Sequence, residues 1–461
     1  MDAQKDKYES KLTTTADLAR QFKPGDRILL GSWYGEPYGV MEAMAQYCGD
    51  VDPLYVSGTI YSGPAEFLDL AGVHNFTNFC GPRERQSQLN HQNVYFTPGQ
   101  FTHFEGWACQ GDPFDYFVHR VAPMDEAGNF SFSLTSSFEY ETIQWIKANR
   151  PKTTIVFEVN PNLPRVYGLK QFGNNELSID YPDVIVEDVR PIMDRAVEPP
   201  TKAAEGIAEI VATLIEDKAT IQLGYGTIPM AIGKLLADRK ELGVHTEMFC
   251  DAHIDLIEHG SITNAHKGLY DGISISTFAL GTKRLHDWVR ENKEFAILPV
   301  SEVNTASVLA RVNQLVSVNS ILTVDMTGQC CAHCLGPRTY SGMGGGFEFA
   351  HGAQLSPGGK SILCLPSTTI LKDGTVVSNI VAQHAAGTRI AIPEHTVDWV
   401  ATEYGAVKLK FLPLDQRGRA LVDIAHPDFR EGLMREMVDA GLRMDRLDEL
   451  PKPPAQFFSR I

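Results

Sequence analysis

A single glutamate inside an apolar stretch is the residue of this chain best suited to do chemistry. Residues 243–251 read GVHTEMFCD, and Glu247 stands in their middle. A carboxylate among apolar residues is costly unless it is paired or used, and loss of water raises both its pKa and its reactivity toward a nearby electrophile. The pattern therefore indicates either a carboxylate nucleophile or a glutamate satisfied by a neighbouring arginine or amide, and spacing alone favours the second interpretation.

A glycine turn follows an apolar run shortly before this segment. Residues 221–232 read IQLGYGTIPMAI, which predicts a strand, a turn over 224–228 and a helix that takes Pro229 as its first residue. Backbone N–H groups at a helix N-terminus attract an anion or an oxyanion, and glycine lets a ligand approach the backbone closely. The turn is thus an anion site or a plain packing turn, and a G-x-G pattern alone favours the latter.

A second group of glycines lies in the segment 341–349, which reads SGMGGGFEF. Close approach of a ligand to the backbone would explain this density of glycine, and a flexible surface loop is the alternative. The strand pattern 320–325 upstream and Gly358-Gly359-Lys360 before the strand pattern 361–365 favour a structured loop.

The elements that must position these residues alternate between helix and strand patterns. A helix pattern and a strand pattern fall within 13–31. A helix pattern at 139–149 precedes a strand pattern at 153–159, and a helix pattern at 202–216 precedes a strand pattern at 219–223. Further buried-strand candidates occupy 273–280, 295–300, 320–325 and 361–365. This alternation predicts an α/β fold with mainly parallel sheets covered by helices.

Chain length predicts two domains. A chain of 461 residues with 43% hydrophobic content exceeds the roughly 250–300 residues at which one core stops growing. The stretch 187–200 has three prolines and mixed charge, and it precedes the strongest helical pattern in the chain. We therefore expect a domain boundary near residues 190–200.

Composition disfavours several classes of protein. A net charge of −16 disfavours partners with a phosphate backbone, such as nucleic acids. The charged start MDAQKDKYES has no apolar segment after it, and no apolar window is long enough to span a membrane. Eight cysteines are too sparse for a disulfide scaffold, so a cytoplasmic location is expected.

A run of cysteines suggests a metal but has the wrong spacing for one. Cys330, Cys331, His333 and Cys334 lie within five residues. Structural zinc usually takes its ligands from two separated stretches, and adjacent cysteines rarely surround one tetrahedral ion. We predict no metal, and a strand at the rim of the active site is the simpler interpretation.

Taken together, these motifs give the chain a specific resemblance. It resembles the acetyl-CoA hydrolase/transferase family over nearly its whole length, and the nearest members look like 4-hydroxybutyrate and butyrate CoA-transferases. The motifs that carry the resemblance are PMDEAGNFSFS (123–133), GYGTIP (224–229), GVHTEMFCDAHIDLIEHGSITNAHK (243–267), SGMGGGFEF (341–349), VVSNIVAQH (376–384), ATEYG (401–405) and RALVDIAHPDFR (419–430).

The resemblance implies a fold and a set of site residues. It implies two open α/β domains, 1–198 and 199–461, with the active site in the cleft between them, and at least a homodimer. It also implies that Glu247 is the nucleophile of a double displacement through a covalent glutamyl-CoA thioester, with CoA as co-substrate and no metal. Contacts with CoA or the reaction's oxyanions would come from Gly224, Tyr225, Gly226, Thr227, Ile228, Gly344, Gly345 and Gly346, and further CoA contacts from Lys267 and Lys360, for which surface lysines are the alternative.

Three departures leave the substrate open. Family members commonly have Gln and Asp where this chain has Gly346 and Glu348, and Asn or Asp where it has Met230. The acids considered are 4-hydroxybutyrate, butyrate, acetate and a dicarboxylate such as itaconate or succinate. A dicarboxylate would need a cation, for which Arg83, Arg85 and Arg165 are candidates. An acyl-CoA hydrolase that uses the same glutamate, and a CoA-binding metabolite sensor without turnover, are the rival functions.

Overall fold

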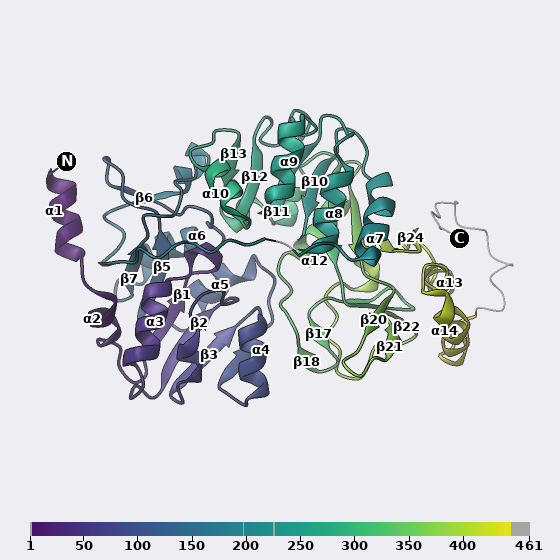
Figure 1. Cartoon of the computed structure of the whole chain (residues 1–461), viewed down its shortest axis with the longest axis horizontal. Coiled ribbons are helices and arrows are strands. Elements are labelled where there is room, and N and C mark those ends of the chain that lie inside the picture. The colour runs from purple at the N-terminus through teal and green to yellow at the C-terminus, as the bar shows by residue number, and fades with distance from the viewer. Residues whose placement is uncertain (1, 197, 225, 444–461) are drawn as a thin grey trace. The chain divides into compact units, whose positions relative to one another are not determined.

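The computed structural model describes residues 2–196, 198–224 and 226–443, and the chain divides into two compact units (Figure 1). The first unit contains the chain up to Arg195 together with Ile275–Val303 and Thr339–Gly344. The second contains Ala196–Ser274, Asn304–Arg338 and the chain from Gly345 onward. This division differs from the expected domains 1–198 and 199–461, because two later segments of the chain are grouped with the first unit.

The first unit is built on a seven-stranded sheet in which every neighbouring pair is parallel. The spatial order is β4-β3-β2-β1-β5-β7-β9, so the strand order reverses beside β1. The apolar run at the end of β1 is fully buried, as expected of a central parallel strand. The strands are β1 (Arg27–Leu30), β2 (Leu54–Gly58), β3 (Val73–Thr77), β4 (Val94–Phe96), β5 (Tyr116–Val121), β7 (Thr154–Val159) and β9 (Val184–Glu187).

Helices and short strands complete the first unit. Thr14 caps the first predicted helix by accepting the Asp17 N–H at 3.0 Å. The helix predicted at 139–149 is confirmed as α6 (Glu139–Asn149). The other elements are α1 (Asp2–Lys11), α2 (Thr15–Ala19), α3 (Tyr38–Tyr47), α4 (Pro82–Leu89), α5 (His103–Gln110), α10 (Lys283–Val289), β6 (Asn129–Ser131), β8 (Glu176–Ser178), β12 (Ser274–Ala279) and β13 (Phe295–Ile297).

The second unit contains the strands β11-β10-β14-β19-β23-β24 in that spatial order. Neighbours are parallel from β11 to β23, and β24 runs antiparallel to β23. The order reverses beside β10, and ligands of open α/β sheets bind outside the carboxyl ends of the strands at such a reversal. The strands are β10 (Thr220–Leu223), β11 (Gly243–Phe249), β14 (Leu315–Ser320), β19 (Lys360–Cys364), β23 (Trp399–Thr402) and β24 (Gly405–Lys408).

The predicted helix at 202–216 is confirmed as α7 (Lys202–Thr213), which Thr201 caps. The strand predicted at 320–325 is instead divided between the end of β14 and a short strand of another sheet, because the chain leaves the main sheet after Ser320. The remaining elements are α8 (Thr227–Leu235), α9 (Asp251–His259), α11 (Ala306–Leu309), α12 (Gly346–Leu355), α13 (Leu414–Asp423), α14 (Pro427–Asp439), β15 (Thr323–Asp325), β16 (Cys330–Cys331), β17 (Cys334–Leu335), β18 (Arg338–Thr339), β20 (Thr368–Ile370), β21 (Val376–Ser378) and β22 (Ile380–Val381).

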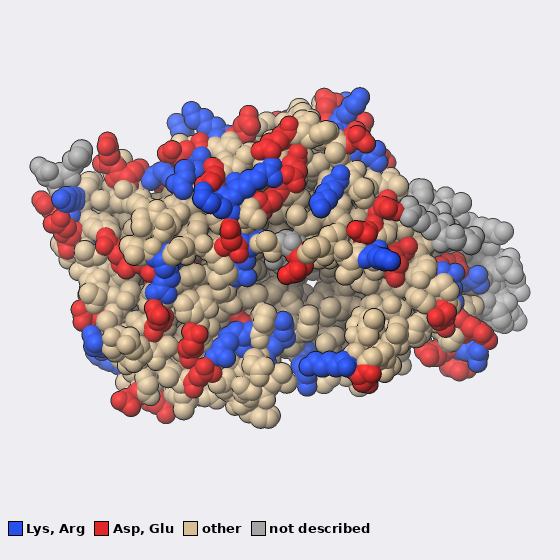
Figure 2. Space-filling view, in the orientation of Figure 1, with Lys and Arg blue, Asp and Glu red and all other residues tan. Residues whose placement is uncertain are grey.

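Two features of the described structure bear on membranes and on polyanionic partners. Among the helices that the structure describes, none is long and apolar enough to cross a membrane. On the face shown in Figure 2, lysine and arginine side chains are interspersed with aspartate and glutamate rather than gathered in one basic area.

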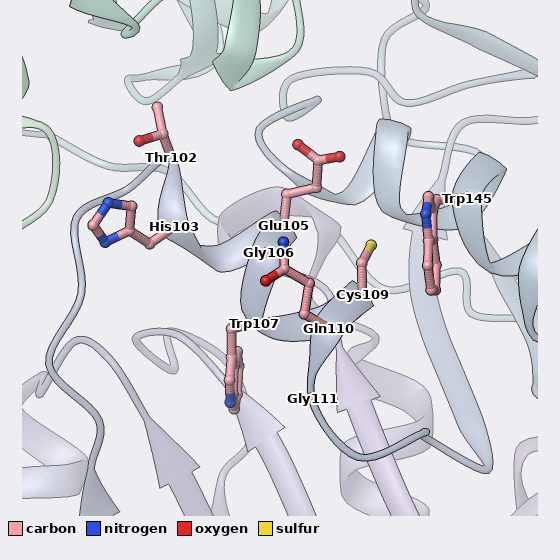
Figure 3. Close-up of a pocket in the computed structure, with 9 residues that line it drawn as sticks. All are labelled: Thr102, His103, Glu105, Gly106, Trp107, Cys109, Gln110, Gly111 and Trp145. Atoms are coloured by element: carbon pink, nitrogen blue, oxygen red, sulfur yellow. The ribbon is translucent and has the colours of Figure 1, made fainter.

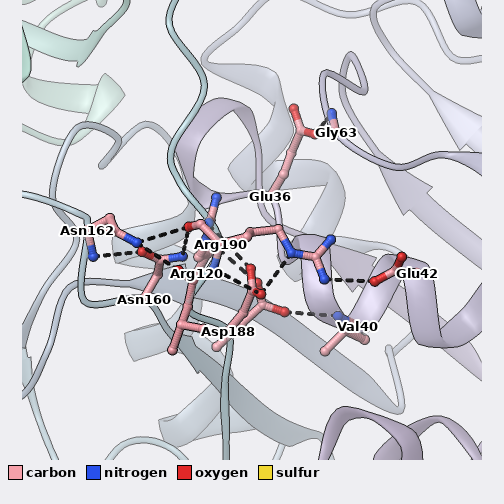
Figure 4. A network of polar contacts seen from close by, with 11 residues as sticks. Glu36, Val40, Glu42, Gly63, Arg120, Asn160, Asn162, Asp188 and Arg190 are labelled. Atoms are coloured by element: carbon pink, nitrogen blue, oxygen red, sulfur yellow. Dashed lines mark hydrogen bonds and ion pairs between the residues drawn. The ribbon is translucent and has the colours of Figure 1, made fainter. Parts of the chain in front are cut away.

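A buried ionic network fixes the chain where it leaves the sheet of the first unit (Figure 4). The Arg120 side chain has no exposed surface and lies 3.6 Å from Glu158 and 3.4 Å from Asp188. Asp188 also pairs with Arg190 at 2.8 Å, and the Asn160 amide donates to the Arg190 carbonyl at 2.9 Å. The segment after β9 is therefore held by ion pairs of Asp188 with the buried Arg120 and with the partly exposed Arg190.

Removal of the buried Arg120 cation tests the network. Arg120→Met is expected to lower the free energy of unfolding by about 3–5 kcal/mol, because the fully buried Glu158 loses its cation and Asp188 keeps only Arg190. Lys5→Met is the control, since Lys5 and Glu9 are exposed by 76% and 60% and their 3.8 Å contact contributes less than about 1 kcal/mol. Urea denaturation followed by circular dichroism measures both, and equal small losses would contradict the expectation.

Candidate active site

Glu247 lies near the carboxyl end of β11, beside the strand at which the sheet order reverses. In the parallel pairing of β10 with β11, Thr220 lies opposite Gly243. Glu247 lies four residues after Gly243, and Gly224 lies four residues after Thr220. The glutamate and the predicted glycine turn are therefore at the same edge of the same sheet, where the fold places ligands.

The Glu247 carboxylate is half-buried and is contacted by two hydrogen-bond donors. The side-chain amide of Asn304 donates to Glu247 Oε2 at 2.6 Å. The Gly345 backbone N–H donates to the same carboxylate. Asn304 also donates to Glu348 Oε2 at 2.9 Å, so that one amide nitrogen contacts two carboxylates.

This environment changes the acidity of Glu247. Burial raises the pKa of Glu247 to about 8, and the neighbouring Glu348 charge acts in the same direction. The bonds from Asn304 and Gly345 oppose both effects because they favour the ionised carboxylate. Such a carboxylate is more basic than an ordinary glutamate, and a fraction of it is still ionised at neutral pH.

Gly345 must lack a side chain for this arrangement to exist. A Cβ atom there would lie 1.9 Å from Glu247 Oε2 and 2.4 Å from Asn304 Nδ2. Gly345 caps α12, so the carboxylate faces the positive end of a helix dipole. The other glycines of this loop do not make room for the carboxylate. Gly344 has a φ of 51°, and a Cβ at Gly346 would meet no atom within 4 Å.

The predicted turn after β10 is present, and Gly226 shows why glycine is used there. Gly226 has a φ of 127° and caps α8, which begins at Thr227, so Pro229 lies in the first turn rather than at its first residue. A Cβ at Gly226 would meet no atom within 4 Å. The Ile228 side chain is buried, so only its backbone could face a ligand, and Tyr225 lies outside the described residues.

Lys267 and Lys360 lie at the opposite edge of the sheet. The Lys267 side chain is fully buried, and its Nζ donates to the carbonyls of Val244 at 3.0 Å and Ile273 at 2.5 Å. Burial lowers the pKa of Lys267 to about 7. Lys360 begins β19, and its Nζ donates to the Leu214 carbonyl at 3.1 Å. Both lysines are placed to join structural elements, and neither is brought to Glu247.

The arginines considered for a second substrate carboxylate already have partners. Arg83 pairs with Asp69 at 2.5 Å. Arg85 donates to the carbonyl of Tyr340 at 2.6 Å. Arg165 pairs with two carboxylates at 2.7 Å each, those of Asp125 and Glu176. A role for any of them in binding a dicarboxylate would require the loss of these contacts.

The cysteine cluster is also packed internally. Cys331 and Cys334 have their sulfur atoms 3.3 Å apart, and the Cys330 thiol donates to the Gly328 carbonyl at 3.4 Å. Burial raises the pKa of Cys331 to about 11, so its thiol stays protonated at neutral pH. Within residues 2–196, 198–224 and 226–443, no group of three or more His, Cys, Asp or Glu side chains is arranged to hold a metal ion.

A pocket of about 740 Å³ in the first unit contains none of the predicted site residues. Figure 3 shows Trp107 of α5 and Trp145 of α6 on opposite sides of it. It is lined by Thr102, His103, Glu105, Gly106, Trp107, Cys109, Gln110, Gly111 and Trp145.

Sequence reasoning missed Asn304, the residue that joins the two carboxylates. Its surroundings, VSEVNTAS, contain no motif, and it reaches Glu247 only because the chain between β13 and α11 returns to the end of β11. Glu348 was noticed only as a departure from the family pattern. Its carboxylate is 6% exposed and is held in the first turn of α12.

Comparison with known proteins relates this chain to the acetyl-CoA hydrolase/transferase family and to CoA-transferases. The profile of the acetyl-CoA hydrolase/transferase C-terminal domain matches residues 281–437. The chain is 33% identical to the succinyl-CoA:cyclohexane-1-carboxylate CoA transferase of Geobacter metallireducens, over 95% of this chain and 97% of that protein. It is 32% identical to the 4-hydroxybutyrate coenzyme A transferase of Clostridium kluyveri, over 93% and 97%. The crystal structure of RipA from Yersinia pestis is similar with a TM-score of 0.86 at 29% identity, over 96% of this chain and all of that one.

The fold and the relatives together define an enzyme that transfers coenzyme A. The chain belongs to the acetyl-CoA hydrolase/transferase family and is a CoA-transferase. The predicted family and the predicted α/β class with mainly parallel sheets are confirmed.

Proposed function

We propose that this CoA-transferase moves CoA between an acyl-CoA and a free short-chain carboxylic acid, and that Glu247 carries the CoA as a thioester between the two half-reactions. The observation that supports this most is the Glu247 carboxylate at the carboxyl edge of the sheet, with Asn304 and Gly345 both donating to it. Two donors would also satisfy a structural glutamate, so it is the position of Glu247 at the carboxyl edge of the sheet that favours a catalytic role.

Each half-reaction can be written with the carboxylate as nucleophile. Glu247 attacks the acyl-CoA carbonyl carbon, the C–S bond breaks, and a mixed anhydride forms as CoA leaves as a thiolate. The thiolate then attacks the glutamyl carbonyl carbon, the C–O bond breaks, and the first acid leaves as a carboxylate. The second acid reverses these steps on the glutamyl-CoA thioester, so no proton is gained or lost overall.

Asn304 and Gly345 suit the second attack in particular. When the thiolate adds to the glutamyl carbonyl, negative charge develops on the oxygen that stays with Glu247. Asn304 already contacts Oε2 at 2.6 Å, so Oε2 is the oxygen expected to stay and Oε1 the one that attacks. Loss of one donor aimed at such an oxyanion typically costs about a hundredfold or more in rate.

The remaining roles follow from the relatives and from the turn after β10. We place the pantetheine end of CoA near the backbone of Gly226 and Thr227, because glycine there lets a ligand approach closely. The Gly224 N–H already donates to the Val318 carbonyl at 3.0 Å, so Gly224 would contact the ligand without donating to it. The relatives act on 4-hydroxybutyrate and cyclohexane-1-carboxylate according to their names. For this chain we propose 4-hydroxybutyrate, butyrate, acetate or a dicarboxylate such as itaconate or succinate.

An assay of acyl-CoA turnover with and without an acceptor acid tests the proposal. We expect rapid conversion of acetyl-CoA or butyryl-CoA to a new acyl-CoA when a suitable acid is added, and little loss of thioester without it. Loss of thioester that no acid changes would instead assign a hydrolase. Binding of acyl-CoA with neither exchange nor hydrolysis would assign a metabolite sensor.

The cellular location and the oligomeric state of the enzyme are further predictions. A cytoplasmic location fits the eight free thiols in the structure. A homo-oligomer is expected by analogy with the family, and light scattering during size exclusion measures its mass.

A further inference from the structure

Asn304 holds an orientation that one carboxylate alone would not explain. Its Nδ2 lies 2.6 Å from Glu247 Oε2 and 2.9 Å from Glu348 Oε2, which uses both N–H groups of the amide. Its Oδ1 is buried and has no hydrogen-bond partner among the described residues. An unpaired buried carbonyl is unfavourable, so the two carboxylates must together keep the amide this way round.

Glu348 is well suited to prevent the opposite orientation. An ionised carboxylate only accepts hydrogen bonds, so a rotated amide would direct Oδ1 at Glu348 and at Glu247 and would be repelled by both. Glu348 lies in the first turn of α12, the helix whose cap is Gly345. One helix end therefore supplies a direct donor to Glu247 and the acceptor that orients the second donor.

The charge of Glu348 has a separate consequence. Two carboxylates joined through one amide repel each other while Glu247 is ionised. In a glutamyl-CoA thioester the Glu247 side chain is neutral, and this repulsion disappears. Glu348 therefore disfavours the free carboxylate relative to the thioester.

We propose that Glu348 is a positioning residue for the nucleophile, which accepts one N–H of Asn304 and thereby aims the other at Glu247 Oε2. This inference rests on the proposed function of Glu247. It assigns a role to a position at which the family pattern differs from this chain.

Two variants separate orientation from packing. In Glu348→Gln the amide of the new side chain can donate to Asn304 Oδ1 and stabilise the rotated Asn304, so kcat is expected to fall by roughly 10- to 100-fold. The acidic limb of kcat/KM, which reports ionisation of Glu247, should also move to lower pH, because the Glu348 charge raises the pKa of Glu247 by more than the Asn304 bond lowers it. Glu348→Asp keeps the acceptor and the charge. Its kcat should stay within about tenfold of the parental value, and the acidic limb of its kcat/KM should stay near the original pH.

An exposed glutamate provides the control for the Glu348 variants. Glu431→Gln removes an exposed carboxylate, 84% accessible, and should change neither kcat nor the limb. A Glu348→Gln enzyme with unchanged kcat and an unchanged limb would overturn the inference. So would equal losses in both Glu348 variants with the limb unmoved, because that result describes packing alone.

A double-mutant cycle keeps the inference testable if Glu348→Gln does not fold. Asn304→Ser removes the amide that Glu348 orients. Glu348→Ala, which removes the acceptor, should therefore lower kcat in the parent enzyme but have little further effect on kcat in the Asn304→Ser background. Independent, multiplicative effects would contradict the inference. If the parent enzyme forms no CoA adduct on Glu247, the proposed function itself fails. If the adduct forms and the cycle shows no coupling, only the role of Glu348 fails.

Discussion

Glu247→Gln is expected to lower kcat for CoA transfer by about ten-thousand-fold or more, the scale of loss when a catalytic nucleophile is removed. Glutamine has the same shape but no anionic oxygen, so the mixed anhydride cannot form. Binding of acyl-CoA should change by less than about threefold, because the substitution leaves both glycine segments intact. Steady-state kinetics and calorimetric titration with acyl-CoA measure the two quantities.

The control for this variant is again Glu431→Gln, which removes a carboxylate far more exposed than Glu247. It should transfer CoA at the parental rate. A Glu247→Gln enzyme that keeps more than about a tenth of the parental kcat would show that the glutamate is not the nucleophile.

Gly345→Ala should produce the second largest effect. The new Cβ would occupy the space of Glu247 Oε2, 1.9 Å away, and of Asn304 Nδ2, 2.4 Å away. The carboxylate and its donor must move apart, and a displacement of about 1 Å at a reacting centre can cost about a hundredfold in rate. We expect kcat to fall by roughly 100- to 1000-fold, with the loss measured on protein whose circular dichroism is unchanged.

The neighbouring glycine provides a matched control. A Cβ at Gly346 meets no atom within 4 Å, and Gly346 is the first residue of α12. Gly346→Ala should therefore stay within about threefold of the parental kcat. Equal losses in the two variants would point to general disturbance of the loop rather than to displacement of Glu247.

The parts of the site that sequence predicted are those with a local cause. Gly226 follows a strand, caps a helix and needs a φ of 127°, all of which depend on a few adjacent residues. Glu247 was notable because its neighbours in the chain are apolar. The alternation of helices and strands likewise predicted parallel sheets, since that pattern repeats locally along the chain.

The parts that sequence could not predict depend on contacts between distant segments. Asn304 contacts Glu247 because of the path the chain takes, and nothing in its local pattern distinguishes it from a surface asparagine. Lys267 follows a family motif, yet it bonds to the carbonyl of Val244 at the amino end of β11 and to that of Ile273, directly before β12. The return of residues 275–303 to the first unit also has no local signal.

The adjacent glycines 344–346 also have roles that the sequence alone could not predict. Their common composition suggested one shared role in approach to CoA. In the structure only Gly345 leaves room for the carboxylate, while Gly344 satisfies a left-handed backbone and Gly346 begins a helix. Composition predicted that the loop matters, and tertiary contacts decide what each glycine does.

Mass spectrometry of the protein incubated with acyl-CoA tests the central claim most directly. The account predicts that the peptide containing Glu247 gains CoA as a thioester, and that an acceptor acid discharges it while Glu247→Gln gains nothing. CoA transfer that proceeds at full rate with no adduct on that peptide, or with an adduct on a different residue, would contradict it.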